Sequence, residues 1–139
     1  MKTVMLVDGL NMFIRSYIVN PTMDRHGNPI GGCIGFLKSL QKISNKFLPD
    51  EIIVCWDGHG GSQKRKQLNK NYKQGRAPVR FNRRLIELPP EEQEKNKAYQ
   101  LLRLMEYLNE MPIIQMVVDF VEADDIISFG ARHPFYDGW

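Results

Sequence analysis

Five carboxylates in this sequence are placed in a way that predicts a metal site. They are Asp8, Asp57, Glu122, Asp124 and Asp125. They follow three short apolar runs, each typical of a buried strand. Like charges a few ångströms apart repel and raise each other's pKa, and a bound cation removes that cost. Because hard oxygen ligands suit Mg²⁺ and Mn²⁺, we expect one of these ions at this site.

The chemistry that such a site supports is hydrolysis of a phosphate ester. A divalent ion lowers the pKa of a water, and two metals about 4 Å apart stabilise the attacking and leaving oxygens. Each acid alone also has a structural explanation. Asp-Gly, at residues 8–9 and 57–58, is a common turn pair, and acids at a helix start favour the helix dipole. The metal interpretation therefore rests on the joint pattern of acids at every strand end.

A basic segment between His59 and Ile86 contains nine Lys or Arg residues and no acid, out of 19 basic residues in the chain. They are Lys64, Arg65, Lys66, Lys70, Lys73, Arg76, Arg80, Arg83 and Arg84. A block of one sign predicts binding to a polyanion such as a nucleic-acid backbone; a solvated charged loop is the alternative. Tyr72 and Phe81 could stack on bases, although a buried aromatic fits equally well.

Strands and helices alternate along the chain. We predict strands over residues 3–7, 51–56 and 113–120, and helices over 12–17 (capped by Asn11), 33–48, from Pro89-Pro90 onward and over 122–131, with loops over 20–32 and 133–139. This order argues for an α/β domain with a parallel sheet. In such sheets functional groups gather beyond the carboxyl ends of the strands, so the five acids should share one edge.

Two helices carry apolar residues at helical spacing. The predicted core stripes are Ile34, Leu37, Leu40, Ile43 and Phe47 in the first, opposite Lys38, Lys42 and Lys46, and Leu101, Leu102, Leu104, Met105 and Leu108 in the second. Cys33 and Cys55 match no metal-ligand spacing and are expected to be small buried residues.

Composition narrows the class of protein. The 139 residues suffice for one domain, and 42% hydrophobic with 25% charged residues is ordinary for a globular protein. No apolar run approaches the roughly 20 residues that span a bilayer, and the N-terminus lacks the features of a signal peptide. We expect a cytoplasmic protein without a membrane partner.

Five motifs in order resemble the flap endonuclease and 5′-3′ exonuclease family, in particular the 5′-nuclease domain of bacterial DNA polymerase I and phage 5′-exonucleases. They are DGLNMFIRSY (residues 8–17), GNPIGGCIGFLKSL (27–40), VCWDGHGGSQKR (54–65), NYKQGR (71–76) and VEADD (121–125). The resemblance implies a PIN-like (resolvase-like) α/β domain over residues 1–139, with a basic helical-arch insertion at about 58–100. It implies removal of 5′ flaps and RNA primers, in a bacterial cell or a phage-infected host.

The resemblance also implies residue roles. Asp8, Asp57, Glu122 and Asp124 would hold one metal, with Asp125 a further ligand or a neighbouring acid. Lys73 and Arg76 would act on the scissile phosphate, and Arg65 would assist. The other residues expected to contact nucleic acid are Lys64, Lys66, Lys70, Tyr72, Arg80, Arg83 and Arg84.

The family pattern continues beyond these motifs with a fourth strand, which carries an Asp-rich motif for a second metal, and with a helix–three-turn–helix element. We find neither the fourth strand nor the helix–three-turn–helix element in the 139 residues. We predict that Asp137 is a turn residue. We therefore expect weak two-metal hydrolysis and an exposed sheet edge. Three hypotheses stay open: a 5′-nuclease, active alone or completed by another chain; a truncated domain that binds branched nucleic acid and one metal; and a PIN-like ribonuclease, which the long basic insert disfavours.

Overall fold

The computed structural model describes residues 2–58, 88–118 and 122–132. Its contacts divide the chain into two compact units. The first unit comprises Met1–Leu10, Pro49–Pro78 and Pro112–Trp139, and the second comprises Asn11–Leu48 and Val79–Met111. Within the described residues, no helix is long and apolar enough to cross a membrane.

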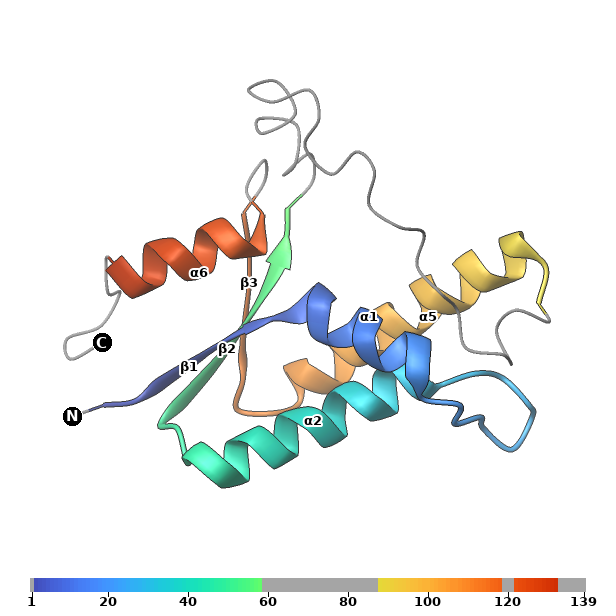
Figure 1. The fold of residues 1–139 in the computed structure, drawn as a ribbon, viewed down its shortest axis with the longest axis horizontal. Coiled ribbons are helices and arrows are strands. Elements are labelled where there is room, and N and C mark those ends of the chain that lie inside the picture. The colour runs from blue at the N-terminus through green and yellow to red at the C-terminus, as the bar shows by residue number, and fades with distance from the viewer. Residues whose placement is uncertain (1, 59–87, 119–121, 133–139) are drawn as a thin grey trace, which may run out of the picture. The chain divides into compact units, whose positions relative to one another are not determined.

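The first unit is a parallel sheet with one helix on it (Figure 1). Its strands are β1 (Val4–Asp8), β2 (Glu51–Asp57) and β3 (Ile114–Val118), in the order β1-β2-β3. Both pairs are parallel, with Asp8 opposite Cys55 and Asp57 opposite Val118. The helix α6 (Ala123–Arg132) contacts β1 and β2. All three strands therefore end at the same edge of the sheet.

The core of this unit lies between the sheet and α6. Ile53 and Cys55 of β2 pack with Ala123 and Ile126 of α6, and residues of β1 and β3 surround them. Every residue from Ile53 to Trp56 is at most 6% exposed. A continuous apolar run of this kind is typical of a central parallel strand with both faces covered.

Trp56 fixes the end of β2 in two ways. Its indole Nε1 donates a hydrogen bond of 2.9 Å to Oε1 of Gln115 on the neighbouring strand β3. Its ring also lies so close to Gly9 that a Cβ there would come within 2.7 Å of the ring carbons. Glycine is required at this position because no side chain fits between the backbone and the indole.

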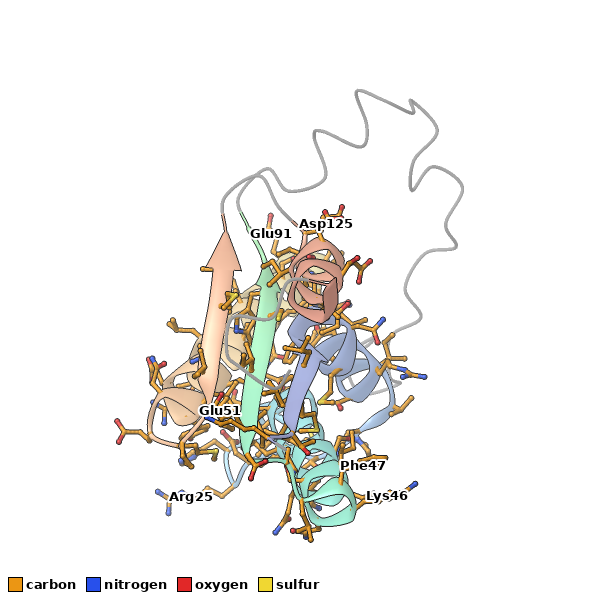
Figure 2. All side chains as sticks on the ribbon, turned by 90° about the vertical axis from the view of Figure 1, so that its left-hand side faces the viewer. Arg25, Lys46, Phe47, Glu51, Glu91 and Asp125 are labelled. Atoms are coloured by element: carbon orange, nitrogen blue, oxygen red, sulfur yellow. The ribbon has the colours of Figure 1, made fainter. Side chains whose placement is uncertain are left out.

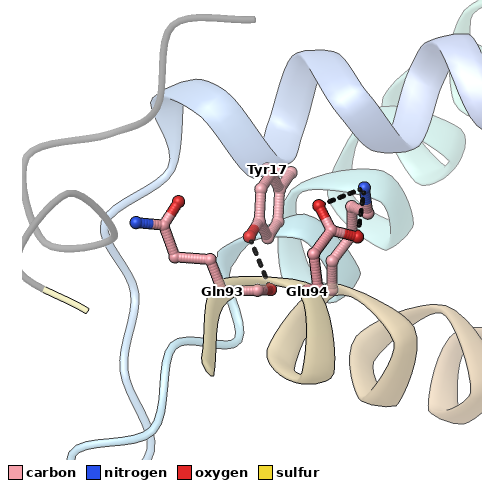
Figure 3. Close-up of polar contacts among 4 residues, drawn as sticks. Tyr17, Gln93 and Glu94 are labelled. Carbon is pink, nitrogen blue, oxygen red and sulfur yellow. Dashed lines mark hydrogen bonds and ion pairs between the residues drawn. The ribbon is translucent and has the colours of Figure 1, made fainter. Parts of the chain in front are cut away.

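The second unit consists of three helices (Figure 1), whose largest buried side chains are mainly aromatic residues and leucines. The helices are α1 (Gly9–Val19, from Asn11 onward in this unit), α2 (Gly31–Phe47) and α5 (Pro90–Asn109). Phe13 and Tyr17 of α1 stack with their ring centroids 5.7 Å apart. The Tyr17 hydroxyl donates a hydrogen bond of 3.2 Å to the carbonyl oxygen of Gln93, beside the Glu94–Lys97 ion pair (Figure 3).

The loop between α1 and α2 is held by its own polar groups. The Asp24 carboxylate accepts hydrogen bonds from the backbone N–H groups of His26 and Asn28 and from the Asn28 amide. An isolated antiparallel bridge joins Met23 to Pro29. Gly27, with φ of +83°, makes the tight turn at the tip, a conformation that costs glycine little.

The predicted elements are present with shifted ends and faces. Every predicted strand and helix that falls on described residues is found, and both cysteines are buried. The helix cap at Asn11 was wrong, because α1 begins at Gly9 and Asn11 lies inside it. The stripes were only partly right: Phe47 is 61% and Leu102 59% exposed, whereas Phe36, which we had not included, is fully buried.

Candidate functional site

The carboxyl edge of the sheet is the candidate site. Asp8 is the last residue of β1 and is half-buried, and Asp57 is the last residue of β2 and is exposed. Figure 2 shows Asp125 of α6 at this edge, whereas Glu51 lies at the opposite end of β2. The parallel arrangement therefore brings acids from separate parts of the sequence to one edge, as predicted.

A hydrogen bond joins the end of β2 to the start of α6. Oδ1 of Asp57 accepts a hydrogen bond of 2.7 Å from the backbone N–H of Ala123, the first residue of α6. N–H groups in the first turn of a helix have no intrahelical partner, and a carboxylate there also interacts favourably with the helix dipole. Asp57 thus fixes where α6 begins.

Glu122 occupies the position just before α6. Its carbonyl oxygen accepts hydrogen bonds from the N–H groups of Asp125 and Ile126, at 3.0 and 3.2 Å. Only 3% of Glu122 is exposed, while Asp124 is exposed and Asp125 half-buried. Burying an ionised carboxylate is costly unless it is paired, hydrogen-bonded or coordinates a metal. Glu122 therefore brings a buried oxygen donor to the edge where Asp57 ends β2.

The pKa of the Cys55 thiol depends on its burial and on the charge of Asp8. Burial, and to a lesser extent the neighbouring negative charge of Asp8, together raise the pKa of Cys55 to about 11. A thiol must lose its proton to bind a metal, so Cys55 stays a neutral core residue at neutral pH. The donors at this edge are then oxygens, which suit a hard divalent cation.

The acids do not form a closed cluster. Across residues 2–58, 88–118 and 122–132, no three His, Cys, Asp or Glu side chains lie close enough together to hold a metal ion. Mg²⁺ is usually bound through one or two carboxylates and keeps several waters. The oxygen donors at this edge fit such an ion, and the assignment of all five acids as ligands stays a prediction.

The predicted nucleic-acid contacts lie outside the described residues. This applies to the phosphate-contacting residues Lys73 and Arg76 and to Arg65, Lys64, Lys66, Lys70, Tyr72, Arg80, Arg83 and Arg84. Of the predicted arch over 58–100, residues 90–100 form the first half of α5. The arch and the single-domain organisation stay predictions.

Sequence reasoning missed several polar residues that the structure puts to use. The Gln115 side chain accepts a hydrogen bond from the indole N–H of Trp56. The Gln100 side chain accepts one from the backbone N–H of Cys33 at the start of α2. Each could have been noticed as a single amide within an otherwise apolar stretch. Lys95 and Tyr99 line a hollow beside the loop of residues 20–30, and no pattern in the sequence indicates this hollow.

Comparison with known proteins defines the class. The chain resembles solved structures of a bacteriophage T5 enzyme: the T5 5′-exonuclease with zinc bound (TM-score 0.59, 16% identity, 93% of this chain and 43% of that one) and the T5 flap endonuclease in a complex with DNA and metal ions (TM-score 0.58, 15% identity, the same coverage). At this identity the likeness shows the fold alone, an α/β domain with a parallel sheet.

The family follows from the sequence comparison. The family model described as 5′-3′ exonuclease, N-terminal resolvase-like domain, matches residues 3–136. This chain belongs to that family.

Among curated relatives, a 5′-3′ exonuclease of Buchnera aphidicola is 31% identical over 132 residues, which is 91% of this chain and 40% of the relative. A flap endonuclease Xni of Shewanella woodyi is 29% identical over 129 residues, or 92% and 43%. The chain spans about two fifths of the length of these relatives.

Proposed function

We propose that this protein is a metal-dependent 5′-nuclease that hydrolyses phosphodiesters in flapped or branched DNA and in RNA primers. The observation that carries the proposal is the carboxyl edge of the sheet, where Asp8 and Asp57 end neighbouring strands and Glu122 leads into α6. Family membership and the metal-containing relatives of the same fold support it. The expected ion is Mg²⁺ or Mn²⁺.

In this proposal the acids hold the ion and orient the reaction. When bound, the ion supplies an activated water and neutralises negative charge on the phosphate. Asp57 offers its second oxygen while Oδ1 stays on the N–H of Ala123. Glu122, Asp124 and Asp125 approach from the start of α6, and Asp8 from β1.

The basic segment has the second task in the proposal. Lys73 and Arg76, with help from Arg65, neutralise charge that develops at the scissile phosphate. The remaining cations contact the phosphate backbone, and Tyr72 stacks on a base. These roles rest on the resemblance of the NYKQGR motif to the family pattern.

Cleavage of a 5′-labelled flap tests the proposal. We expect cutting with Mg²⁺ or Mn²⁺ and none with EDTA. The variant Asp57→Asn keeps an oxygen acceptor for Ala123 but removes the charge, so it should lose activity while staying folded. Glu51→Gln is a matched control, because it removes a carboxylate from the other end of the same strand (Figure 2). Equal loss in both variants would contradict the proposed site.

A second candidate function is binding without cutting, and the lack of a three-acid cluster within the described ranges favours it. In that case the chain holds one ion and branched nucleic acid without cutting, or it is one half of a split nuclease whose further acids come from a second chain. Metal-dependent binding of the flap by a folded chain that leaves it intact would identify this function. Cutting that Asp57→Asn abolishes would exclude it.

A further inference from the structure

The second unit contains a hollow of about 360 Å³ between the loop of residues 20–30 and the first half of α5. It is lined by Gly27, Asn28, Pro29, Leu88, Glu92, Lys95, Asn96 and Tyr99. Sites for small ligands have volumes of roughly 300–1,000 Å³, so this hollow has room for a ligand of modest size. It contains none of the acids of the candidate metal site.

One face of α5 supplies the chemistry of the hollow. Glu92, Lys95 and Tyr99 follow one another at spacings of three and four residues, which places them on one side of the helix. Tyr99 is 54% exposed and offers an aromatic surface. Lys95 makes no ion pair with any described residue, in contrast to Lys97, which pairs with Glu94 at 3.0 Å.

The opposite wall of the hollow, formed by the loop of residues 20–30, is held in place by hydrogen bonds within the protein. The Asn96 side chain donates a hydrogen bond of 2.9 Å to the carbonyl oxygen of Pro29 and accepts one of 2.8 Å from Gln100. Asp24 holds Asn28 through both its backbone N–H and its amide. A site whose walls are ordered before binding loses less entropy when a ligand enters.

We propose that this hollow binds one nucleotide of a single strand. Tyr99 stacks on the base, because every base has a π-face and aromatic stacking is tolerant of sequence. The ammonium of Lys95, one helical turn away, binds the phosphate of the same nucleotide. Glu92 accepts a hydrogen bond from a base N–H group or a sugar hydroxyl. Together with stacking on Tyr99, this contact makes the site favour a nucleotide over inorganic phosphate.

The place of the hollow in the chain agrees with this occupant. Leu88 lines it, four residues after Arg84, the last cation of the basic segment. The inference rests on the proposed nuclease function, because the single strand is the substrate's. It adds a contact in the second unit, apart from the acids.

The first test is binding of a fluorescent oligothymidylate to the whole chain in EDTA, where no metal-dependent cleavage occurs. We expect Lys95→Met and Tyr99→Leu each to weaken binding at least about fivefold. Tyr99→Phe should bind like the unaltered chain. The matched controls are Lys97→Met, with the same charge change on the same helix, and Tyr107→Leu, an exposed tyrosine two turns further on. Each should change affinity less than about twofold.

The second test maps the site without any substitution. Titration with thymidine monophosphate, followed by amide NMR, should shift Gly27, Asn28 and Tyr99, and inorganic phosphate should bind more weakly. Equal weakening by Lys95→Met and Lys97→Met, equal binding of phosphate and nucleotide, or no oligonucleotide binding would overturn the inference. Tighter binding of the oligothymidylate than of thymidine monophosphate identifies a single strand, and not a free nucleotide, as the natural occupant. Flap cleavage in Mg²⁺, measured separately, decides the proposed function whichever result is obtained.

Discussion

Asp57 has two tasks that two substitutions can separate. Its Oδ1 accepts the N–H of Ala123 at 2.7 Å, and its charge belongs to the candidate metal site. Asp57→Ala removes the acceptor and leaves the first N–H of α6 without it. We expect a loss of about 1–2 kcal/mol in the free energy of unfolding, as for other helix caps.

Asp57→Asn retains an oxygen acceptor and should lose less than half as much stability as Asp57→Ala. Urea unfolding monitored by circular dichroism gives both values. Equal losses would mean that the negative charge, and not the hydrogen bond, stabilises the start of α6.

Tyr17 makes stability depend on pH above the neutral range. Burial raises the pKa of its hydroxyl, and the charge of Glu94 raises it further. The neutral hydroxyl donates to the carbonyl of Gln93 (Figure 3). Since the pKa is higher folded than unfolded, the stabilisation is complete below about pH 10, the unfolded value, and is lost as the pH rises through the folded pKa.

Tyr17→Phe removes both the hydrogen bond and the titration. At about pH 8 we expect it to be less stable than the unaltered chain by about 1 kcal/mol. This difference should shrink and then reverse as the pH rises above about 10. Urea unfolding of both chains across this range measures it. A difference that stays constant with pH would contradict the raised pKa.

At the scale of elements, a side chain of helix α5 caps the N-terminus of helix α2. The residue before α2, Ile30, provides no side-chain cap. Instead Oε1 of Gln100, which is 1% exposed, accepts a hydrogen bond of 3.0 Å from the backbone N–H of Cys33, in the first turn of α2. The same amide donates to Asn96 at 2.8 Å. One buried side chain therefore joins the two helices and satisfies a donor that α2 cannot satisfy itself.

Gln100→Leu keeps the approximate volume and removes both hydrogen bonds. We expect a loss of about 2–4 kcal/mol in unfolding free energy, because a buried donor and a half-buried acceptor are left unpaired. Leu102→Gln, at an exposed position of the same helix, is the control and should cost less than about 0.5 kcal/mol. A small effect of Gln100→Leu would show that water replaces the lost partners.

The sequence predicted the elements better than their ends and faces. Strong local signals placed β2 after Pro49-Asp50 and α5 after Pro89-Pro90, and both begin within a residue of those signals. The start of α1 could not be predicted locally, because Gly9 enters the helix directly from β1 beneath the ring of Trp56. Helical spacing identified α2, whereas its buried face depends on small residues.

Glycines determine which face of α2 is buried. A Cβ at Gly32 would lie 2.6 Å from the Phe13 ring, and one at Gly35 would lie 2.6 Å from Ser16. A search for large apolar residues cannot find a surface made by their absence. The candidate site shows the same limit. The order of strands and acids predicted a shared edge, but the bond from Asp57 to Ala123 depends on the distance between two segments 66 residues apart.

At the scale of the whole molecule, the two proposed binding sites belong to different units. Asp8, Asp57, Glu122, Asp124 and Asp125 all lie in the first unit, and the hollow beside α5 lies in the second. A ligand that binds only the folded form of a unit stabilises that unit by mass action. The two sites can therefore be distinguished by where each ligand slows local opening.

Hydrogen exchange measured with and without Mg²⁺ tests this separation. At a Mg²⁺ concentration ten times its dissociation constant, amides that exchange only when the site opens should slow by about tenfold. We expect this slowing near the ends of β1 and β2 and in the first turn of α6, at Ile126 among others. Amides of the second unit, such as Cys33, should not change. Asp57→Asn should abolish the effect, and NaCl of equal ionic strength should not reproduce it. Slowing in both units, or slowing by NaCl alone, would show general screening of charge in place of a metal held at the carboxyl edge.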